Sequence, residues 1–165
     1  MRVLFVCTGN TCRSFMAEQL MEELIDDASD DDRLQKGEIK VSSAGLFAVE
    51  GDEASDFAVK ALDKLYNIDC DRHKARQLDE EVIEDADLIL TMTDSQKHAI
   101  ADAYEDFEDK VFTLKEFAIG PAGDEDENID VDDPYGGELE EYMACAEEIK
   151  ALVDITFEKI IAMEN

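Results

Sequence analysis

The stretch "VLFVCTGNTCRS", residues 3–14, joins a short apolar run to a loop that contains two cysteines and an arginine. The segment "RVLFV" (2–6) is apolar on both faces and contains branched residues, which is typical of a buried parallel strand. The segment "SFMAEQLMEELI" (14–25) has apolar residues at helical spacing, and Ser14 could cap its free amides. The stretch therefore predicts a strand, a tight loop and a helix.

The same alternation of short apolar runs and longer amphipathic segments continues along the chain. Further strands are predicted at 39–45, 86–92 and 110–117, and further helices at 54–68, 95–104 and 138–163. This pattern is typical of an α/β fold in three layers, with a central four-stranded parallel sheet flanked by helices on both faces. The stretch 118–137 carries both prolines and a cluster of acidic residues, so we expect a long irregular loop there.

Length and charge limit the possible functions. A chain of 165 residues with 45% hydrophobic residues can bury one good core, so we expect a single domain spanning 1–165. The formal net charge of −29 should repel nucleic acid and anionic membranes. The apolar run at the N-terminus is too short for a signal peptide, and no later run approaches the length of a membrane helix. We therefore expect a cytoplasmic monomer that binds neither nucleic acid nor membrane.

The four cysteines, at positions 7, 12, 70 and 145, do not form the framework of a small disulfide-rich protein. They also show no metal-ligand spacing with the two histidines, His73 and His98. We expect no metal and no other cofactor. Cys70 and Cys145 are expected to be ordinary core or surface residues.

The loop after the first strand has the chemistry of an anion site. Cys7 leaves the carboxyl end of a parallel strand, where open α/β sheets place their ligands. Successive backbone N–H groups and the N-terminus of the following helix can surround a tetrahedral oxyanion there. Gly9 would let the chain turn without a Cβ clash. The residues between Cys7 and Arg13 are Thr8, Gly9, Asn10, Thr11 and Cys12.

Cys7 and Arg13 are the candidate reactive groups of this loop. The planar guanidinium of Arg13 can bind two phosphate oxygens at once. The donors that hold a phosphate also favour the thiolate form of Cys7, and a thiolate that faces phosphorus is a nucleophile. Displacement at phosphorus also needs a proton donor for the leaving group. Asp133 in "DPYGG" is the best candidate because it precedes the rigid Pro134, and the rivals are Asp132 and Asp130.

Four segments in this order resemble the low-molecular-weight protein tyrosine phosphatases over essentially the whole chain. They are "VCTGNTCRS" near the N-terminus, "SAG" (43–45), "HKARQL" (73–78) and "DPYGG" (133–137). The resemblance implies the phosphotyrosine protein phosphatase I-like fold and a mechanism without metal. In that mechanism Cys7 attacks phosphorus to form a phosphocysteine, Arg13 binds the phosphoryl oxygens, and Asp133 acts first as acid and then as base.

The resemblance also implies roles for residues around these three. The phosphate-binding residues would be Thr8, Gly9, Asn10, Thr11, Cys12 and Ser14, with Tyr135 as a wall of the pocket. Ser43 and His73 would join Asn10 and Ser14 in a supporting hydrogen-bonded scaffold. A reversible Cys7–Cys12 disulfide would switch activity off under oxidation. Phe15 stands where the family commonly has proline; we expect it to pack in the core and to leave catalysis intact.

Thr11 and the segment "TLKEF" (113–117) are more similar to the protein arginine phosphatases of the same family. Thr11 offers a flat ring less apolar contact and can orient a guanidinium or water, whereas Tyr135 could stack on either leaving group. We expect a phosphatase acting on phosphoarginine in proteins, with phosphotyrosine as the alternative. Arsenate reduction is a third hypothesis, but it would want a pair of resolving cysteines. An anion-binding regulatory domain would not need both the thiol and the Asp-Pro loop.

Overall fold

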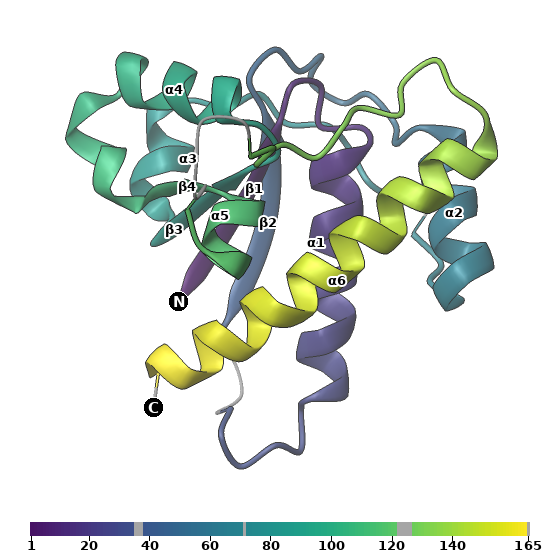
Figure 1. Cartoon of the computed structure of the whole chain (residues 1–165), viewed down its shortest axis with the longest axis horizontal. Helices are drawn as coiled ribbons and strands as arrows, with labels where there is room; N and C mark the ends of the chain where they lie inside the picture. The colour runs from purple at the N-terminus through teal and green to yellow at the C-terminus, as the bar shows by residue number, and fades with distance from the viewer. Residues whose placement is uncertain (35–37, 71, 122–126, 165) are drawn as a thin grey trace.

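The structure is a computed structural model that describes residues 1–34, 38–70, 72–121 and 127–164. In these residues four parallel strands form one sheet in the order β2-β1-β3-β4 (Figure 1). Their bounds are Arg2–Cys7 for β1, Lys40–Gly45 for β2, Leu88–Thr91 for β3 and Val111–Thr113 for β4. The expected four-stranded parallel sheet is therefore confirmed.

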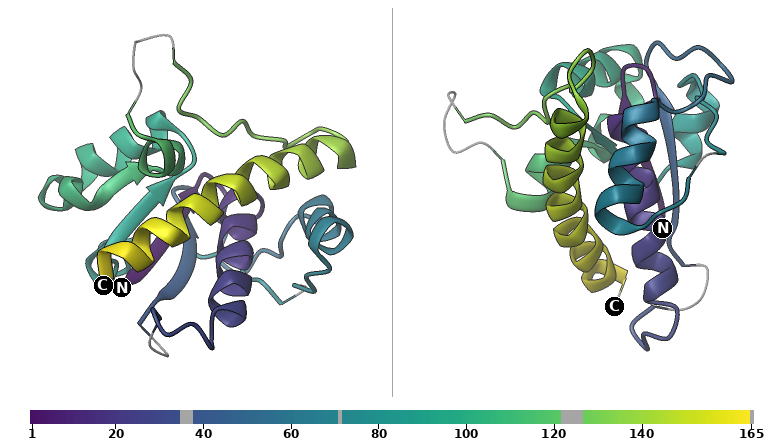
Figure 2. Two further views of the ribbon diagram at one scale, coloured as in Figure 1. Left: turned by 60° about the horizontal axis from the view of Figure 1, so that its bottom comes forward. Right: turned by 90° about the vertical axis from the view of Figure 1, so that its right-hand side faces the viewer.

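Helices cover both faces of this sheet (Figures 1 and 2). One face packs against α1 (Arg13–Asp27), α2 (Asp56–Tyr66), α5 (Leu114–Ile119) and the long α6 (Leu139–Glu164). The other face packs against α3 (Glu80–Asp85), α4 (Asp94–Ala103) and the 3-10 helix η1 (Glu105–Lys110). This arrangement gives the three layers expected from the sequence.

The alternation of side chains along β1 explains the two cores. Val3 and Phe5 lie in the larger apolar cluster, which is shared with α1 and α6. Leu4 and Val6 lie in the smaller cluster, which is shared with α3 and α4. All four side chains are almost fully buried, so a run that is apolar on both faces matches a central strand between two helical layers.

The strand order creates a crevice at the carboxyl end of β1. From β1 the chain passes to β2 on one side of the sheet and later returns to β3 on the other side. The connections after β1 and β3 therefore diverge, which is the arrangement that places ligand sites in open α/β sheets. Cys7, the last residue of β1, lies at this point.

Two local expectations were wrong. The segment 110–117 is not one strand, because β4 ends at Thr113 and α5 begins at the next residue. The side chain of Thr113 accepts a hydrogen bond from the backbone N–H of Glu116 at 3.0 Å, so a helix cap outweighs the β propensity of the segment. The helix α3 was also missed, although Asp79 caps it in the same way through the N–H of Val82.

The expected irregular stretch 118–137 has two exceptions. Its first two residues belong to α5, and residues 122–126 lie outside the described part.

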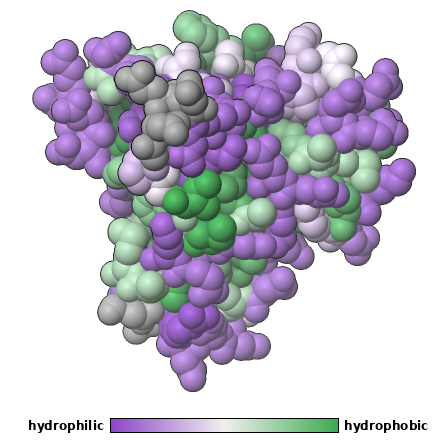
Figure 3. All heavy atoms as spheres, in the orientation of Figure 1, coloured by the Kyte–Doolittle hydropathy of each residue, from purple (hydrophilic) through white to green (hydrophobic). Residues whose placement is uncertain are grey.

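The ends of the chain lie close together, since the amino group of Met1 is 3.9 Å from a carboxylate oxygen of Glu164 (Figure 2). The face in Figure 3 is mostly hydrophilic, in keeping with the net charge. Among the described residues no helix has the length and apolar character needed to cross a membrane.

A pair of matched substitutions tests the position of the core. Ile89 is fully buried in β3, whereas Ile119 is 59% exposed at the end of α5. Ile89→Ala should lower the free energy of unfolding by about 2–5 kcal/mol, because it removes buried methyl groups and leaves a cavity. Ile119→Ala should change it by no more than about 0.5 kcal/mol. Urea unfolding of both variants measures the difference, and similar losses for the two would contradict this packing.

Candidate active site

The loop between β1 and α1 is fixed from outside through its carbonyl groups. The carbonyl oxygen of Cys7 accepts from Leu46 N at 3.0 Å, and that of Thr8 accepts from Phe47 N at 2.9 Å. Farther along, the carbonyl of Asn10 is bonded to a ring nitrogen of His73, and the carbonyl of Thr11 accepts from Ser55 N. A trans peptide points its C=O and N–H in opposite directions. The N–H groups of the following residues therefore point away from the segments that hold these carbonyls; these residues are Thr8, Gly9, Thr11 and Cys12.

Cys7 is 3% exposed, and its Sγ lies 2.8 Å from the Oγ of Ser14. The same Oγ accepts a hydrogen bond from Asn10 Nδ2 at 2.9 Å, which leaves the hydroxyl hydrogen free to point at the sulfur. Ser14 was expected to cap α1, and this was wrong. The N-cap residue is Cys12, which makes no side-chain cap bond, and Ser14 lies inside the first turn. Its hydroxyl contacts the Cys7 thiol and does not cap the free amides of the helix.

Asn10 is the centre of the scaffold behind the loop. Its Nδ2 donates to the hydroxyls of Ser14 and Ser43, both at 2.9 Å. Its Oδ1 accepts from the backbone N–H of Arg76 at 2.9 Å, and its carbonyl lies 2.7 Å from His73 Nε2. This side chain is fully buried, and all its hydrogen-bonding groups are used. The structure thus brings Asn10, Ser14, Ser43 and His73 together.

Glu18 lies at the far end of this scaffold. The hydroxyl of Ser43 donates a short hydrogen bond to Glu18 Oε2, which is also 3.9 Å from His73 Nδ1. Burial raises the pKa of Glu18, against the lowering effects of the Ser43 hydrogen bond and of nearby Arg76. Burial also lowers the pKa of His73. Neutral His73 then donates from Nε2 to Asn10, because a carbonyl oxygen can only accept.

The turn in the loop is made differently from what the sequence indicated. The residue in the left-handed region is Asn10, with φ of 57°, a conformation that asparagine tolerates. Gly9 has no such φ, and a Cβ there would meet nothing closer than Thr11 Oγ1 at 3.7 Å. The close approach is at Gly45, where a Cβ would lie 2.7 Å from the carbonyl oxygen of Thr8 and 3.0 Å from Asn10 N. The glycine that the loop requires is therefore in the neighbouring strand.

Arg13 connects the loop to the segment around Asp133. Its side chain is almost fully buried, and Nη1 donates to the carbonyl oxygen of Val131 at 2.8 Å. Its Nη2 lies 3.5 Å from Asp133 Oδ2, and the Asp133 side chain is 51% exposed. One guanidinium, carried by the residue that ends the loop, thus contacts both the Val131 carbonyl and a solvent-accessible carboxyl group. This is the geometry that a phosphate clamp and a proton donor need.

The rival acids have other surroundings. Asp130 Oδ1 accepts from the backbone N–H of Asp94 at 2.7 Å and so holds the start of α4. Asp132 is exposed, and its carbonyl oxygen lies 3.8 Å from the Sγ of Cys145. Asp133 Oδ1 also accepts from the N–H of Tyr135 at 3.0 Å, so its own turn orients this carboxyl group. The contact to Arg13 favours Asp133 over both rivals.

Two aromatic side chains project from the loops beside the site. Tyr135, two residues after Asp133, is 86% exposed. Phe47 is 80% exposed, and its backbone N–H is bonded to Thr8. The hydroxyl oxygen of Thr11 lies near Gly9, on the loop itself. The surroundings of the loop therefore combine aromatic rings with a hydroxyl group.

The remaining predicted residues lie in the core. Phe15 is fully buried, and its ring centroid is 4.7 Å from that of His73, as expected for core packing. Cys70 and Cys145 are buried. Burial raises the pKa of Cys12 strongly and raises that of Cys145 to about 12. The Cys7–Cys12 disulfide stays a prediction.

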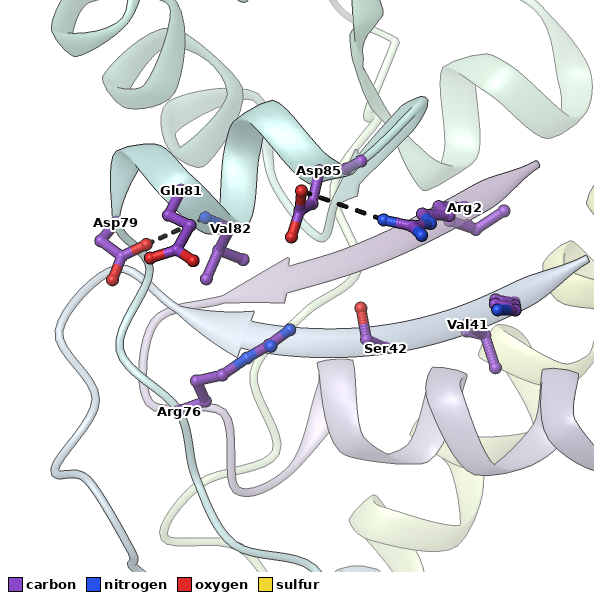
Figure 4. A pocket seen from close by; sticks show the side chains of 11 residues that line it. Arg2, Val41, Ser42, Arg76, Asp79, Glu81, Val82 and Asp85 are labelled. Carbon is purple, nitrogen blue, oxygen red and sulfur yellow. Dashed lines mark hydrogen bonds and ion pairs between the residues drawn. The ribbon is translucent and has the colours of Figure 1, made fainter.

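A hollow of about 390 Å³ lies at the amino ends of β1 and β2, against α3 (Figure 4). Asp85 and Arg2 face each other across it at 3.9 Å. Its charged lining residues are three basic and three acidic ones, namely Arg2, Lys40, Arg76, Asp79, Glu81 and Asp85. These charges balance, so the hollow offers little net attraction to a phosphoryl group. The loop at the other end of β1 is the better candidate site.

Several contributors were missed by the sequence analysis. Glu18 follows Ser14 by one helical turn, and this spacing on the same face is the signal that could have found it. Val131 acts through its backbone carbonyl, for which no side-chain signal exists. Phe47 follows the "SAG" segment closely, but its exposure is a property of the folded loop.

The fold and the loop define an α/β protein with a candidate anion site around a cysteine at the carboxyl edge of a parallel sheet. The chain belongs to the low molecular weight phosphotyrosine protein phosphatase family, whose family model matches residues 2–163. It is 41% identical over 159 residues to a protein-arginine-phosphatase of Geobacillus stearothermophilus, covering 96% of this chain and 95% of the relative. It is 36% identical over 154 residues to the low molecular weight protein-tyrosine-phosphatase PtpB of Staphylococcus epidermidis, covering 93% and 95%.

A solved structure of the same kind is also similar. It is a cysteine-to-serine mutant of the YwlE arginine phosphatase with a phosphorylated active-site serine, with a TM-score of 0.84 and 37% identity. The match covers 97% of this chain and 95% of that one. The resemblance inferred from the four sequence segments is thereby confirmed.

The close approach at Gly45 gives a direct test of the loop. Gly45→Ala should force the Thr8 carbonyl and the Asn10 amide to move, and we expect kcat on an aryl phosphate to fall by about a hundredfold. Circular dichroism and thermal unfolding should show that the fold remains. Gly9→Ala, which meets no close atom, serves as the comparison for stability and should cost no more than about 1 kcal/mol. Full activity of Gly45→Ala would contradict the packing described.

The raised thiol pKa values predict low reactivity for two cysteines. Alkylation requires the thiolate, so Cys12 and Cys145 should stay unmodified by iodoacetamide at pH 7.5 while the protein is folded. In concentrated urea both should be labelled at the rate of ordinary thiols. Peptide mass spectrometry measures the labelling of each cysteine. Equal rates in the folded and unfolded protein would show that burial does not protect them.

Proposed function

We propose that this chain is a cysteine-dependent protein phosphatase that hydrolyses phosphoarginine in proteins through a phosphocysteine intermediate. The observation that carries the proposal is the arrangement around one sulfur. Cys7 Sγ lies 2.8 Å from the Ser14 hydroxyl, and the carbonyl groups of its loop bond outward, which leaves the loop amides available to an anion. The buried Arg13 guanidinium lies 3.5 Å from the accessible carboxyl group of Asp133. Nucleophile, anion cradle, cation and acid are thus supplied by two loops.

The first half of the reaction transfers the phosphoryl group to sulfur. The Cys7 thiolate attacks phosphorus while Arg13 and the loop amides hold the phosphoryl oxygens. A bond from sulfur to phosphorus forms as the bond from phosphorus to the leaving nitrogen breaks. Asp133, in its protonated form, gives its proton to that nitrogen, so arginine leaves as a stable group.

The second half returns the enzyme to its starting state. Asp133, now a carboxylate, takes a proton from a water molecule that attacks the phosphocysteine. The sulfur–phosphorus bond breaks, inorganic phosphate is released, and Cys7 recovers its thiolate. The hydroxyl of Ser14 stabilises the negative sulfur, because the bond from Asn10 leaves it free to donate. No step needs a metal ion.

The preference for phosphoarginine is supported by Thr11 and by the names of relatives. The Thr11 hydroxyl lies beside Gly9 in the loop, where it can orient a guanidinium or the attacking water. The Geobacillus relative and the solved YwlE structure are both named as arginine phosphatases. Tyr135, at 86% exposure, offers a ring on which the guanidinium plane can stack.

Phosphotyrosine is the alternative substrate. The PtpB relative is named as a tyrosine phosphatase, and the exposed rings of Tyr135 and Phe47 would also suit a phenyl group. Arsenate reduction is less well supported. The two further thiols that it would need, Cys70 and Cys145, are buried in a loop after α2 and in α6.

The partner that follows from this activity is a phosphorylated protein. We also propose that the enzyme acts as a monomer in the cytoplasm and binds neither nucleic acid nor membrane. The net charge of −29 supports the last point, because phosphate backbones and anionic lipids would be repelled.

The test compares initial rates on phosphoarginine and phosphotyrosine peptides of the same sequence. Wild type should prefer phosphoarginine. Cys7→Ser should abolish turnover of both peptides, and Asp133→Asn should lower kcat by about 10²- to 10⁴-fold, because it cannot transfer the proton. Thr11→Ile should shift the ratio of kcat/KM toward phosphotyrosine by about tenfold or more.

Each outcome addresses a separate part of the proposal. If wild type prefers phosphotyrosine, the proposed substrate class is wrong, whereas the proposed mechanism is unaffected. An unchanged ratio in Thr11→Ile would remove Thr11 as the reason for the preference. Asp130→Asn and Asp132→Asn are the matched controls for the acid, and a loss as large as that of Asp133→Asn in either would reassign its role.

A further inference from the structure

Gln96 is a buried glutamine in the first turn of α4, and its side chain reaches three different groups. Its Oε1 accepts from the backbone N–H groups of Met92 at 3.0 Å and of Thr93 at 3.1 Å. Its Nε2 donates to the hydroxyl oxygen of Thr8 at 3.2 Å. Thr8 directly follows Cys7. A side chain from α4 therefore contacts the loop between β1 and α1, residues 7–13, which is called the phosphate loop below.

The direction of this amide is set by its partners. Two backbone N–H groups point at one end of the Gln96 side chain, so that end must be the carbonyl oxygen. The NH2 group is therefore the end that faces Thr8. Because the carbonyl of Thr8 also accepts from Phe47, this residue is held on two sides. The peptide groups flanking Thr8, which supply amides to the loop, are fixed in orientation.

The turn that Gln96 binds also carries the acid segment, defined here as residues 130–133. The carbonyl oxygen of Met92 accepts from Val131 N at 2.8 Å, and Asp94 N donates to Asp130 Oδ1 at 2.7 Å. The carbonyl of Val131 in turn accepts from Arg13 at 2.8 Å. A continuous set of hydrogen bonds therefore runs from Thr8 through Gln96 and Met92 to the acid segment and Arg13.

We propose that Gln96 is a positioning residue that keeps the phosphate loop and the acid segment in register. This inference rests on the proposed phosphatase function and adds a residue to it. Gln96 touches no reacting atom. It holds Thr8 and the turn 92–94 as one unit, so that the amides around Cys7 and the carboxyl of Asp133 converge on one phosphoryl group. A small displacement between these two loops would be costly for the chemical step.

The substitution Gln96→Glu separates this role from helix capping. Thr93 and Gln96 form a capping box, and glutamate is an equally good residue at its third position. A carboxylate oxygen still accepts from Met92 and Thr93. The other carboxylate oxygen can only accept, so the Thr8 hydroxyl no longer receives a hydrogen bond and must turn its own hydrogen toward residue 96. We expect a melting temperature within about 2 °C of wild type. We expect kcat on an aryl phosphate at pH 7 to fall by about ten- to a hundredfold.

The pH dependence gives a readout that a general structural defect would not produce. When the introduced carboxyl group takes up a proton at low pH, its O–H can again donate to Thr8. The activity of Gln96→Glu relative to wild type should therefore recover as the pH falls from 7 toward 5. Gln96→Leu, which cannot donate at any pH, should show a constant deficit. Gln19→Glu adds the same charge on a half-exposed part of α1 and should leave kcat unchanged.

Binding of inorganic phosphate, measured by calorimetry, tests the inference without turnover. Gln96→Leu should lower the affinity for inorganic phosphate by about tenfold relative to wild type, because the loop amides lose their fixed orientation. Wild-type kcat in Gln96→Glu at pH 7, a deficit that does not change with pH, or unaltered phosphate affinity in Gln96→Leu would each overturn the positioning role. A wild-type protein that binds phosphate but hydrolyses neither aryl phosphate nor phosphopeptide would refute the proposed function instead.

Discussion

The site depends on the outward hydrogen bonds of four carbonyl groups in the loop between β1 and α1. Their donors come from Leu46, Phe47, Ser55 and His73, and each bond directs a neighbouring N–H group away from these segments. An anion cradle made in this way needs no basic side chain except Arg13. The proposed phosphoryl site is therefore compatible with a net charge of −29.

The sheet gives the cradle its place, and the buried scaffold gives it rigidity. Strand β1 lies between β2 and β3, so the loop begins where the two connections diverge. Asn10 uses its amide, its carbonyl and a left-handed backbone to join the loop to β2 and to the segment after α2. Every buried polar atom in this group has a partner, and such satisfied networks specify one geometry.

Much of the architecture could be predicted because its signals are local. The apolar alternation identified the sheet and the main helices, and the spacing of Cys7 and Arg13 identified the loop. Only residues 111–113 of the strand expected at 110–117 are a strand, because Thr113 caps a helix there and this cap outweighs a β-type pattern. Ser14 was expected to cap α1 because serine is a favoured capping residue at the start of a helix. In the folded loop its hydroxyl instead lies beside the Cys7 sulfur.

The sequence by itself determined the class of fold and the family, and it singled out Cys7 and Arg13 as the candidate nucleophile and cation, since these follow from residue types at short spacing. Only the tertiary structure decided which acid faces Arg13, which glycine the loop requires, and that Glu18, Val131 and Gln96 belong to the site. The physical reason is that these contacts join segments far apart in the chain, or act through backbone groups that every residue possesses.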